Sequence, residues 1–140
     1  IYRYVSIVLG IVIAVAVVFF RFHSLEQINN KQESVAKKYN KDLKNIITPF
    51  VNNHSTSAWA QYCIRVQNRD EMMKKCNDKG VPKAIYYPLP LHLQEVFAYL
   101  GYKNGDFPIA EEISLDIMAL PISAFLTDEE QSYVIDVVNC

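Results

Sequence analysis

The sequence predicts an α/β fold, in which a small sheet of about three strands carries packed helices and an apolar helix precedes it. Three observations support this prediction. Residues 58–66 alternate between apolar and polar side chains, as a half-buried strand does. Ser24 and Thr127 each begin the Ser/Thr-x-x-Gln/Glu pattern that is typical of helix starts. An uncharged run rich in Ile, Val and Phe extends from Tyr4 to Phe20.

The composition is that of one small globular unit. The chain has 140 residues, 51% of them hydrophobic, and a net charge of −1. It is long enough for one core, too short for two, and not basic enough to indicate a nucleic-acid partner. The three histidines are far apart, which argues against a metal cluster. An odd number of cysteines without Cys-x-x-Cys spacing argues against a disulfide framework or a zinc site, and favours a reducing compartment (Cys63, Cys76 and Cys140).

The apolar N-terminal segment has two interpretations. As a helix, residues 4–20 would reach roughly 26 Å, just short of the ~30 Å hydrocarbon core of a membrane. Arg3 precedes the segment and Arg21 follows it, without the small-residue cleavage site of a signal peptide. The segment is either a membrane helix or a stretch foreign to the fold that follows. We therefore divide the chain into residues 1–22 and residues 23–140.

A helix and two strands are predicted next. Ser24 with Gln27 forms a capping box for a helix that ends near Asn45, and its apolar stripe consists of Ile28, Val35, Tyr39 and Leu43. Residues 46–51 form an apolar run broken by Pro49, which suits an edge strand, and a turn follows. The alternation over 58–66 predicts one strand face made of Ala58, Ala60, Tyr62, Ile64 and Val66.

The middle of the chain predicts a helix, a strand and a short helix. Asn68 with Glu71 opens the first helix, Gly80 closes it, and its core-filling residues are Met72, Met73 and Cys76. The apolar residues 84–87 should return as a strand. Residues 94–100 form a short helix that Gly101 stops, and 103–106 form a loop.

Two helices are expected in the last part. Pro108 suits a first helical position, and Asp106 is expected to cap this helix, which should end at Leu120. Its buried residues would be Ile109, Ile113 and Ile117. Thr127 with Glu130 is a second capping box, and the helix that it opens should turn three valines to the core, Val134, Val137 and Val138.

Residues 86–94 form the candidate functional segment. Pro88 and Pro90 stiffen it, and a residue before proline is held extended, so its side chains point in fixed directions. This arrangement is typical of a substrate-contact loop, with the candidate residues Tyr86, Tyr87, His92 and Gln94. Alternatively, the two tyrosines are packing aromatics with solvated hydroxyls, and His92 caps the helix that follows it.

Several sequence phrases occur in one order and spacing: Gly-Val-Pro at 80–82, Tyr-Pro-Leu-Pro-Leu-His-Leu-Gln at 87–94, Leu-Gly-Tyr-Lys-Asn-Gly-Asp-Phe-Pro-Ile-Ala-Glu at 100–111, Ala-Leu-Pro at 119–121 and Leu-Thr-Asp-Glu-Glu-Gln at 126–131. The block of residues 82–138 resembles the C-terminal end of the DegT/DnrJ/EryC1/StrS-type sugar-nucleotide aminotransferases, which use pyridoxal phosphate. Weaker similarity reaches back to about residue 28, and residues 1–20 do not match. The resemblance covers most of the chain but only the last part of a longer enzyme.

The resemblance implies the small C-terminal subdomain of a fold-type I pyridoxal-phosphate aminotransferase. Such enzymes are cytoplasmic homodimers that transfer an amino group from an amino acid, usually glutamate, to a keto-sugar nucleotide in polysaccharide or glycoconjugate synthesis. By position, the resemblance implies that the substrate-binding residues are Tyr86, Tyr87, His92 and Gln94. Many members have histidine where this chain has Tyr86, and a neutral tyrosine cannot pair with a diphosphate as a charged histidine can.

The reactive parts of such an enzyme are missing from the sequence. Pyridoxal phosphate needs a sheltered lysine for its Schiff base, whereas the lysines here lie on polar helix faces or beside turns. We therefore predict no catalytic, cofactor-binding or metal-binding residue, and no activity of the chain alone. The family's Gly-x-Asn-x-Arg loop is also missing between Ile1 and Phe20, which favours a reading-frame or gene-model junction before Phe22. The alternative function is a membrane-tethered, non-enzymatic α/β binding module with Arg21 and nearby lysines on its cytoplasmic side.

Overall fold

The computed structural model describes residues 2–140, and their side chains from Val12 onward. The predicted apolar segment therefore has its first side chains, residues 4–11, outside the described part. The elements in chain order are α1 (Tyr2–Asp42), β1 (Tyr62–Arg65), α2 (Arg69–Asp78), the 3₁₀ helices η1 (Leu91–Leu93) and η2 (Glu95–Leu100), α3 (Pro108–Asp116), β2 (Ile117–Leu120) and α4 (Asp128–Asn139). The mixed helix and strand architecture, with an apolar helix at its start, confirms the predicted class.

The sheet is smaller than the expected three strands. Within residues 2–140 two strands form, β1 and β2, which pair antiparallel with Tyr62 opposite Leu120. The runs expected as further strands contribute one bridge each, Ile47 to Arg65 and Ala84 to Ala119. Pro49 lies within the first run and Pro88 directly follows the second. Because proline supplies no N–H, neither ladder extends. The strand expected over 58–66 begins only at Tyr62, because the backbone of Trp59 is left-handed, with φ of 49°.

The prediction of one helix from Pro108 to Leu120 is wrong. Pro108 is at the helix start as expected, but α3 ends at Asp116 and the next four residues form β2. Ile109 is 74% exposed. The four-residue isoleucine spacing is compatible with a helix, but pairing with β1 overrides this local preference. Phe107, not Asp106, holds the cap position, and the Asp106 carboxylate instead accepts a hydrogen bond from the Lys103 N–H at 2.7 Å.

The predicted capping box at Ser24 is also wrong. Ser24 lies inside α1, and its hydroxyl donates to the Phe20 carbonyl one turn earlier at 2.9 Å. The helix therefore runs without a break across residue 22. The local pattern cannot distinguish a helix start from a serine within a longer helix whose preceding residues are also helical.

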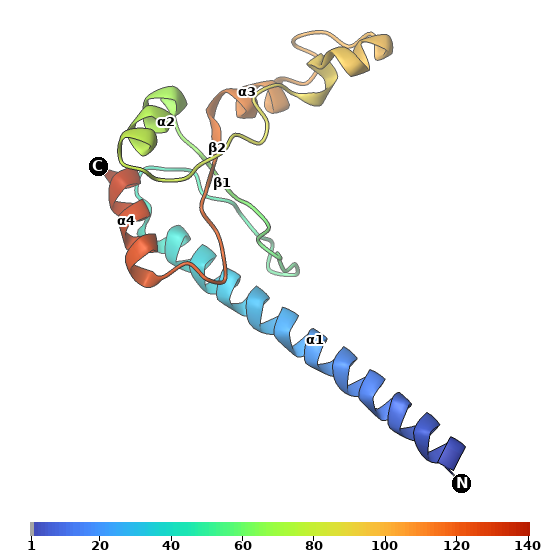
Figure 1. Cartoon of the computed structure of the whole chain (residues 1–140). Coiled ribbons are helices and arrows are strands. Elements are labelled where there is room, and N and C mark those ends of the chain that lie inside the picture. The colour runs from blue at the N-terminus through green and yellow to red at the C-terminus, as the bar shows by residue number, and fades with distance from the viewer. Residues whose placement is uncertain (1) are drawn as a thin grey trace.

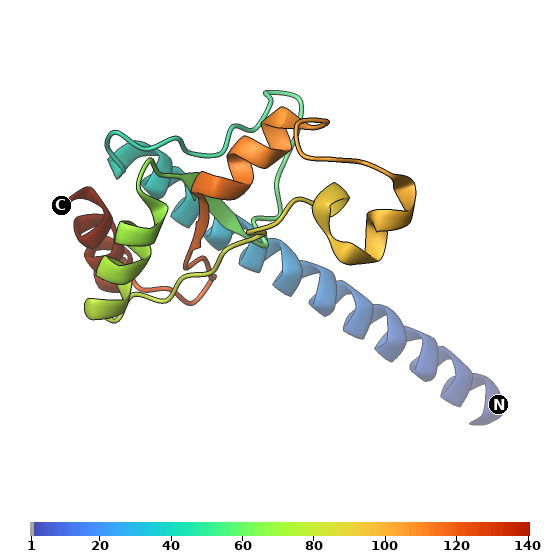
Figure 2. The same cartoon turned by 90° about the horizontal axis from the view of Figure 1, so that it is seen from above.

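The core lies where the C-terminal half of α1 meets the sheet, α2 and α4 (Figures 1 and 2). Val35, Tyr39 and Leu43 of the predicted stripe are buried, whereas Ile28 is exposed. The rings of Tyr39 and Tyr62 pack with centroids 4.9 Å apart. The predicted core positions of α2 and α4 are confirmed, with Cys76, Val134, Val137 and Val138 buried and Met72 and Met73 packed against the core.

Two segments project from this core. The first part of α1 extends away from the body in both views (Figures 1 and 2), and its apolar side chains from Val12 to Phe22 are exposed. Over Val12–Asp42 this helix is long and apolar enough, by length and composition, to cross a membrane. The second projecting segment, yellow in Figure 1, contains η1 and η2. It carries the candidate functional residues.

Candidate functional site

The candidate segment leaves the edge of the sheet and returns to it through α3. Ala84 forms the last bridge to β2, and η1 and η2 follow before the chain re-enters the body at Pro108 (Figure 1). Neither η1 nor η2 contains a buried residue. We call residues 86–94 the ribbon. Its position depends on a few polar and aromatic contacts, because the core does not enclose it.

Tyr86 and Tyr87 lie side by side at the start of the ribbon. Their rings contact edge to face with centroids 5.8 Å apart, and Tyr87 is 64% exposed. Tyr86 lines a hollow of about 290 Å³ beside the bridge between Ala84 and Ala119. Its polar lining includes Gln61 and Lys83. Of the four predicted site residues, Tyr86 alone lines this hollow in the described part of the chain.

His92 lies at the other end of the ribbon, against α3. Its side chain is 8% exposed, and its Nε2 atom lies 2.9 Å from Oε1 of Glu111. The ring also packs on Phe107, with centroids 4.8 Å apart. The alternative that His92 caps the next helix is wrong, because Gln94 holds that position and no side chain caps η2.

Gln94 stabilises the ribbon itself. Its side-chain amide donates to the Leu89 carbonyl at 3.4 Å. Its backbone N–H also donates to the Leu91 carbonyl at 3.1 Å. The structure therefore places the four candidates in two groups. The two tyrosines lie together at one end of the ribbon, His92 and Gln94 lie at the other end, and the prolines lie between them.

Glu111 links three parts of the site. Its carboxylate accepts from the Gly105 N–H at 2.9 Å and from the Phe107 N–H at 3.3 Å, besides contacting His92. These hydrogen bonds, the Gly105 N–H first among them, hold the pKa of Glu111 below its ordinary value despite partial burial. Glu111 is therefore ionised at neutral pH, and the start of α3 favours that charge.

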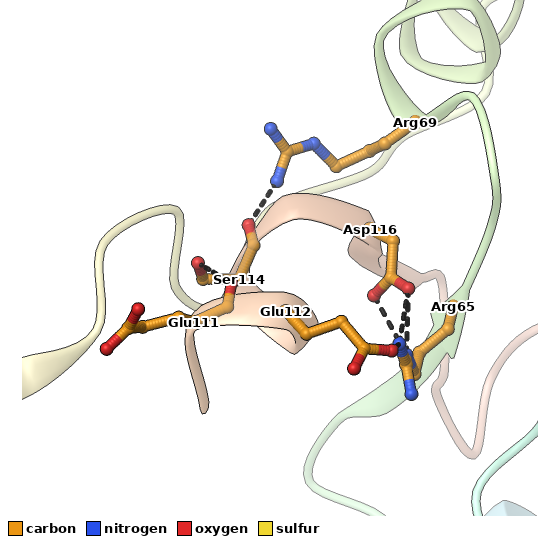
Figure 3. A network of polar contacts seen from close by, with 6 residues as sticks. All are labelled: Arg65, Arg69, Glu111, Glu112, Ser114 and Asp116. Carbon is orange, nitrogen blue, oxygen red and sulfur yellow. Dashed lines mark hydrogen bonds and ion pairs between the residues drawn. The ribbon is translucent and has the colours of Figure 1, made fainter. Parts of the chain in front are cut away.

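A separate network fixes α3 to the sheet (Figure 3). The Arg65 guanidinium of β1 contacts both oxygens of Asp116, with Nε 2.9 Å from each and Nη2 2.6 Å from Oδ2. Its Nη2 also lies 2.6 Å from Glu112. Arg69 donates to the Ser114 carbonyl at 2.5 Å. The two carboxylates raise the pKa of Arg65, Asp116 chiefly. The Arg65–Asp116 pair and the Arg69 contact fix the end of α3 to the sheet, whereas Glu112, whose side chain is 68% exposed, adds only an outer contact.

Sequence reasoning missed Glu111, Arg65 and Asp116. Glu111 is the last residue of the 100–111 phrase, and its charge in a first helical turn is a local signal. Glu112 and Asp116 are four residues apart and so share a helix face. Two neighbouring carboxylates on one face indicate that a cationic side chain pairs with them. Nothing local identifies that cation as Arg65.

The lysines do not offer a site for the expected cofactor. All of them lie among the residues whose side chains are described, and none is buried. A Schiff-base lysine must be sheltered to be neutral. Lys83 is the one that lines the hollow near Tyr86, and it is half-buried. Within the described residues, no three His, Cys, Asp or Glu side chains are placed to hold a metal ion.

Residues 12–139 match the sequence model of the DegT/DnrJ/EryC1/StrS aminotransferase family. The match begins inside the apolar segment, so the expectation that the first 20 or so residues lie outside it is wrong from residue 12 onward. The matched range and α1 both cross residue 22 without a break.

Individual relatives show the same similarity. A pleiotropic regulatory protein of Geobacillus stearothermophilus is 34% identical over 126 residues, which are 86% of this chain and 34% of the relative. A dTDP-3-amino-3,6-dideoxy-alpha-D-galactopyranose transaminase of Aneurinibacillus thermoaerophilus is 29% identical over 89% of this chain and 34% of its own length. The crystal structure of S. venezuelae DesV with a ketimine intermediate superimposes with a TM-score of 0.81 at 27% identity, over 89% of this chain and 34% of DesV. The chain spans about one third of the length of these relatives.

Proposed function

Because the chain belongs to the DegT/DnrJ/EryC1/StrS aminotransferase family, we propose that it is the C-terminal, substrate-contacting part of a sugar-nucleotide aminotransferase. The whole enzyme would transfer an amino group from an amino acid, usually glutamate, to a keto-sugar nucleotide. The observation that carries this proposal is the match over residues 12–139 to a family of aminotransferases, together with the fold shared with DesV.

The ribbon supplies groups that suit a sugar nucleotide. Tyrosine hydroxyls both donate and accept hydrogen bonds, as sugar hydroxyls and phosphate oxygens require. Tyr86 and Tyr87 are exposed and adjacent, and the tyrosine pair begins directly after the sheet edge that fixes Ala84. His92 and Gln94 are held by internal contacts, so their free edges are oriented before any ligand binds.

The cofactor chemistry would come from outside this chain. Pyridoxal phosphate supplies the electron sink of transamination when it is bound. Residues 12–140 contribute no sheltered amine to hold it, so this chain's residues would bind and orient the sugar nucleotide only. We infer that the chain alone is inactive and that the cofactor site, the amino-acid donor site and a second subunit complete it.

A titration of the ¹⁵N-labelled chain with dTDP-glucose tests the proposed recognition role. We expect amide shifts confined to residues 86–94, and about fivefold weaker binding of Tyr87→Phe, because a hydrogen bond contributes about 1 kcal/mol. Tyr133→Phe is the matched control, since its hydroxyl donates to the Lys79 carbonyl, away from the ribbon. Shifts spread over α2 and α4, or no binding by the wild-type chain, would contradict the proposal.

One observation favours a second candidate function, a membrane-tethered binding module. Side chains from Val12 to Phe22 are exposed around the whole circumference of α1, and a helix that is apolar on all sides suits lipid or complete burial in protein. Alkaline carbonate extraction of expressing cells separates the two candidates. The enzyme interpretation predicts release from the membrane fraction into the supernatant and a cytoplasmic location, whereas retention with the lipid would favour the tether.

A further inference from the structure

The ring of His92 is held by a carboxylate that can only accept. Nε2 of His92 lies 2.9 Å from Oε1 of Glu111, and an ionised carboxylate has no proton to donate. The proton of a neutral His92 ring must therefore be on Nε2. The other ring nitrogen, Nδ1, is then left as a hydrogen-bond acceptor.

Nδ1 is available for such a bond. It has no hydrogen-bond partner among the described residues, and none of their buried side-chain nitrogen or oxygen atoms lacks a partner. Nδ1 therefore keeps contact with solvent, although the side chain as a whole is only 8% exposed. Phe107 packs on the ring and limits its rotation.

Glu111 is itself fixed in place. The backbone N–H groups of Gly105 and Phe107 donate to its carboxylate. The backbone N–H of Glu111 in turn donates to the Phe107 carbonyl at 3.1 Å. The carboxylate thus connects the ribbon, the loop before α3 and the first turn of α3. With Phe107, these contacts attach the far end of a ribbon whose short helices contain no buried residue.

We propose that Glu111 is a positioning residue that holds His92 in the Nε2–H tautomer and thereby presents Nδ1 as an acceptor toward the sugar nucleotide. The part of the proposal that concerns the sugar nucleotide rests on the proposed function; the tautomer does not. Nδ1 would accept a hydrogen bond from a hydroxyl of the sugar, because sugar hydroxyls can donate to an unprotonated ring nitrogen.

Glu112 provides a matched control. It is the next residue of the same helix, and its carboxylate turns to Arg65 while Glu111 points away from that network (Figure 3). Replacing either residue by methionine removes one carboxylate and conserves length. Glu111→Gln is a second, milder variant in which the charge alone is lost.

The experiment uses the ¹⁵N-labelled chain at neutral pH, without and with dTDP-glucose. Long-range ¹H–¹⁵N correlation spectra of the imidazole ring should show His92 of the wild-type chain protonated at Nε2 and unprotonated at Nδ1. In Glu111→Met and Glu111→Gln, we expect the Gly105 amide to exchange with solvent at least about tenfold faster, since its acceptor is lost or weakened. Affinity for dTDP-glucose should fall about fivefold, while Glu112→Met keeps wild-type values of both quantities.

The outcomes separate the inference from the proposed function. A wild-type His92 ring protonated at Nδ1, or an unchanged Gly105 exchange rate in both Glu111 variants, would overturn the inference whatever the ligand does. Binding that falls equally in Glu112→Met would overturn it as well. A wild-type chain that shows the Nε2–H ring but binds no dTDP-glucose would overturn the proposed function, and with it the ligand-facing role of Nδ1.

Discussion

At the scale of single residues, two carboxylates on adjacent turns of α3 have different tasks. Asp116 pairs with Arg65 and fixes the helix to β1, whereas Glu111 holds the loop and His92. The side chains of both pairs are largely shielded from solvent, and their geometries set where the ribbon lies. The residue types in the ribbon were readable from the sequence. Their partners were not, because Glu111 is 19 residues from His92 along the chain.

The pKa of Glu111 leads to a prediction about acid. This pKa is lowered in the folded chain, mainly by the hydrogen bond from the Gly105 N–H. The contact therefore stabilises the fold fully at pH values above the ordinary carboxyl pKa. This stabilisation is lost as the pH falls through the lower pKa of the folded chain. The Gly105 amide shift, followed by NMR from neutral to acid pH, should change with a midpoint below the usual carboxyl value of about 4.3.

Controls identify the titrating group. Glu111→Gln should abolish this step, while Asp106→Asn, which alters the neighbouring carboxylate of the loop, should keep it. A midpoint at or above the ordinary carboxyl range would contradict the assigned hydrogen bonds.

At the scale of elements, two copies of the same capping-box pattern lead to different structures. Thr127 and Glu130 form the predicted capping box, with Glu130 N–H to the Thr127 hydroxyl at 3.2 Å and Thr127 N–H to the Glu130 carboxylate at 2.9 Å. Ser24 and Gln27 show the same spacing but lie within α1. The difference is the context, since loop precedes Thr127 and apolar helix precedes Ser24. For the same reason β2 was not predictable, because its strand geometry depends on β1.

Loss of the Thr127 cap gives a measurable prediction. Thr127→Ala should lower the free energy of unfolding by about 1 kcal/mol, since it leaves an N–H of the first turn of α4 without its acceptor. Urea unfolding followed by circular dichroism measures this change. Thr56→Ala, at an exposed threonine of the loop before β1, should change stability by less than about 0.5 kcal/mol. Equal effects would argue against the cap.

At the scale of the whole molecule, the chain has one core and two projecting segments. The core was largely predictable, because Tyr39, Tyr62 and Val134 follow helix or strand periodicity. The projecting segments expose apolar side chains, among them Phe19 and Phe20 of α1 and Tyr99 of η2. Exposed apolar patches of this extent mark surfaces that other protein or lipid covers.

Self-association is the expected consequence in solution. Static light scattering of the purified chain should give a mass above that of the monomer, because the exposed apolar side chains of α1 can pack against a second copy. Phe19→Ser combined with Phe20→Ser should shift the mass toward the monomer, whereas substitution of the already polar Gln32 should not. A wild-type chain that stays monomeric at high concentration would contradict this expectation.

We propose that the chain carries a recognition segment of a sugar-nucleotide aminotransferase without the amine that holds the cofactor. The most direct test of this proposal is to mix the purified chain with pyridoxal phosphate, reduce with borohydride and map the product by mass spectrometry. We expect only weak labelling scattered over exposed lysines such as Lys31 and Lys103. Stoichiometric labelling of one lysine would contradict it.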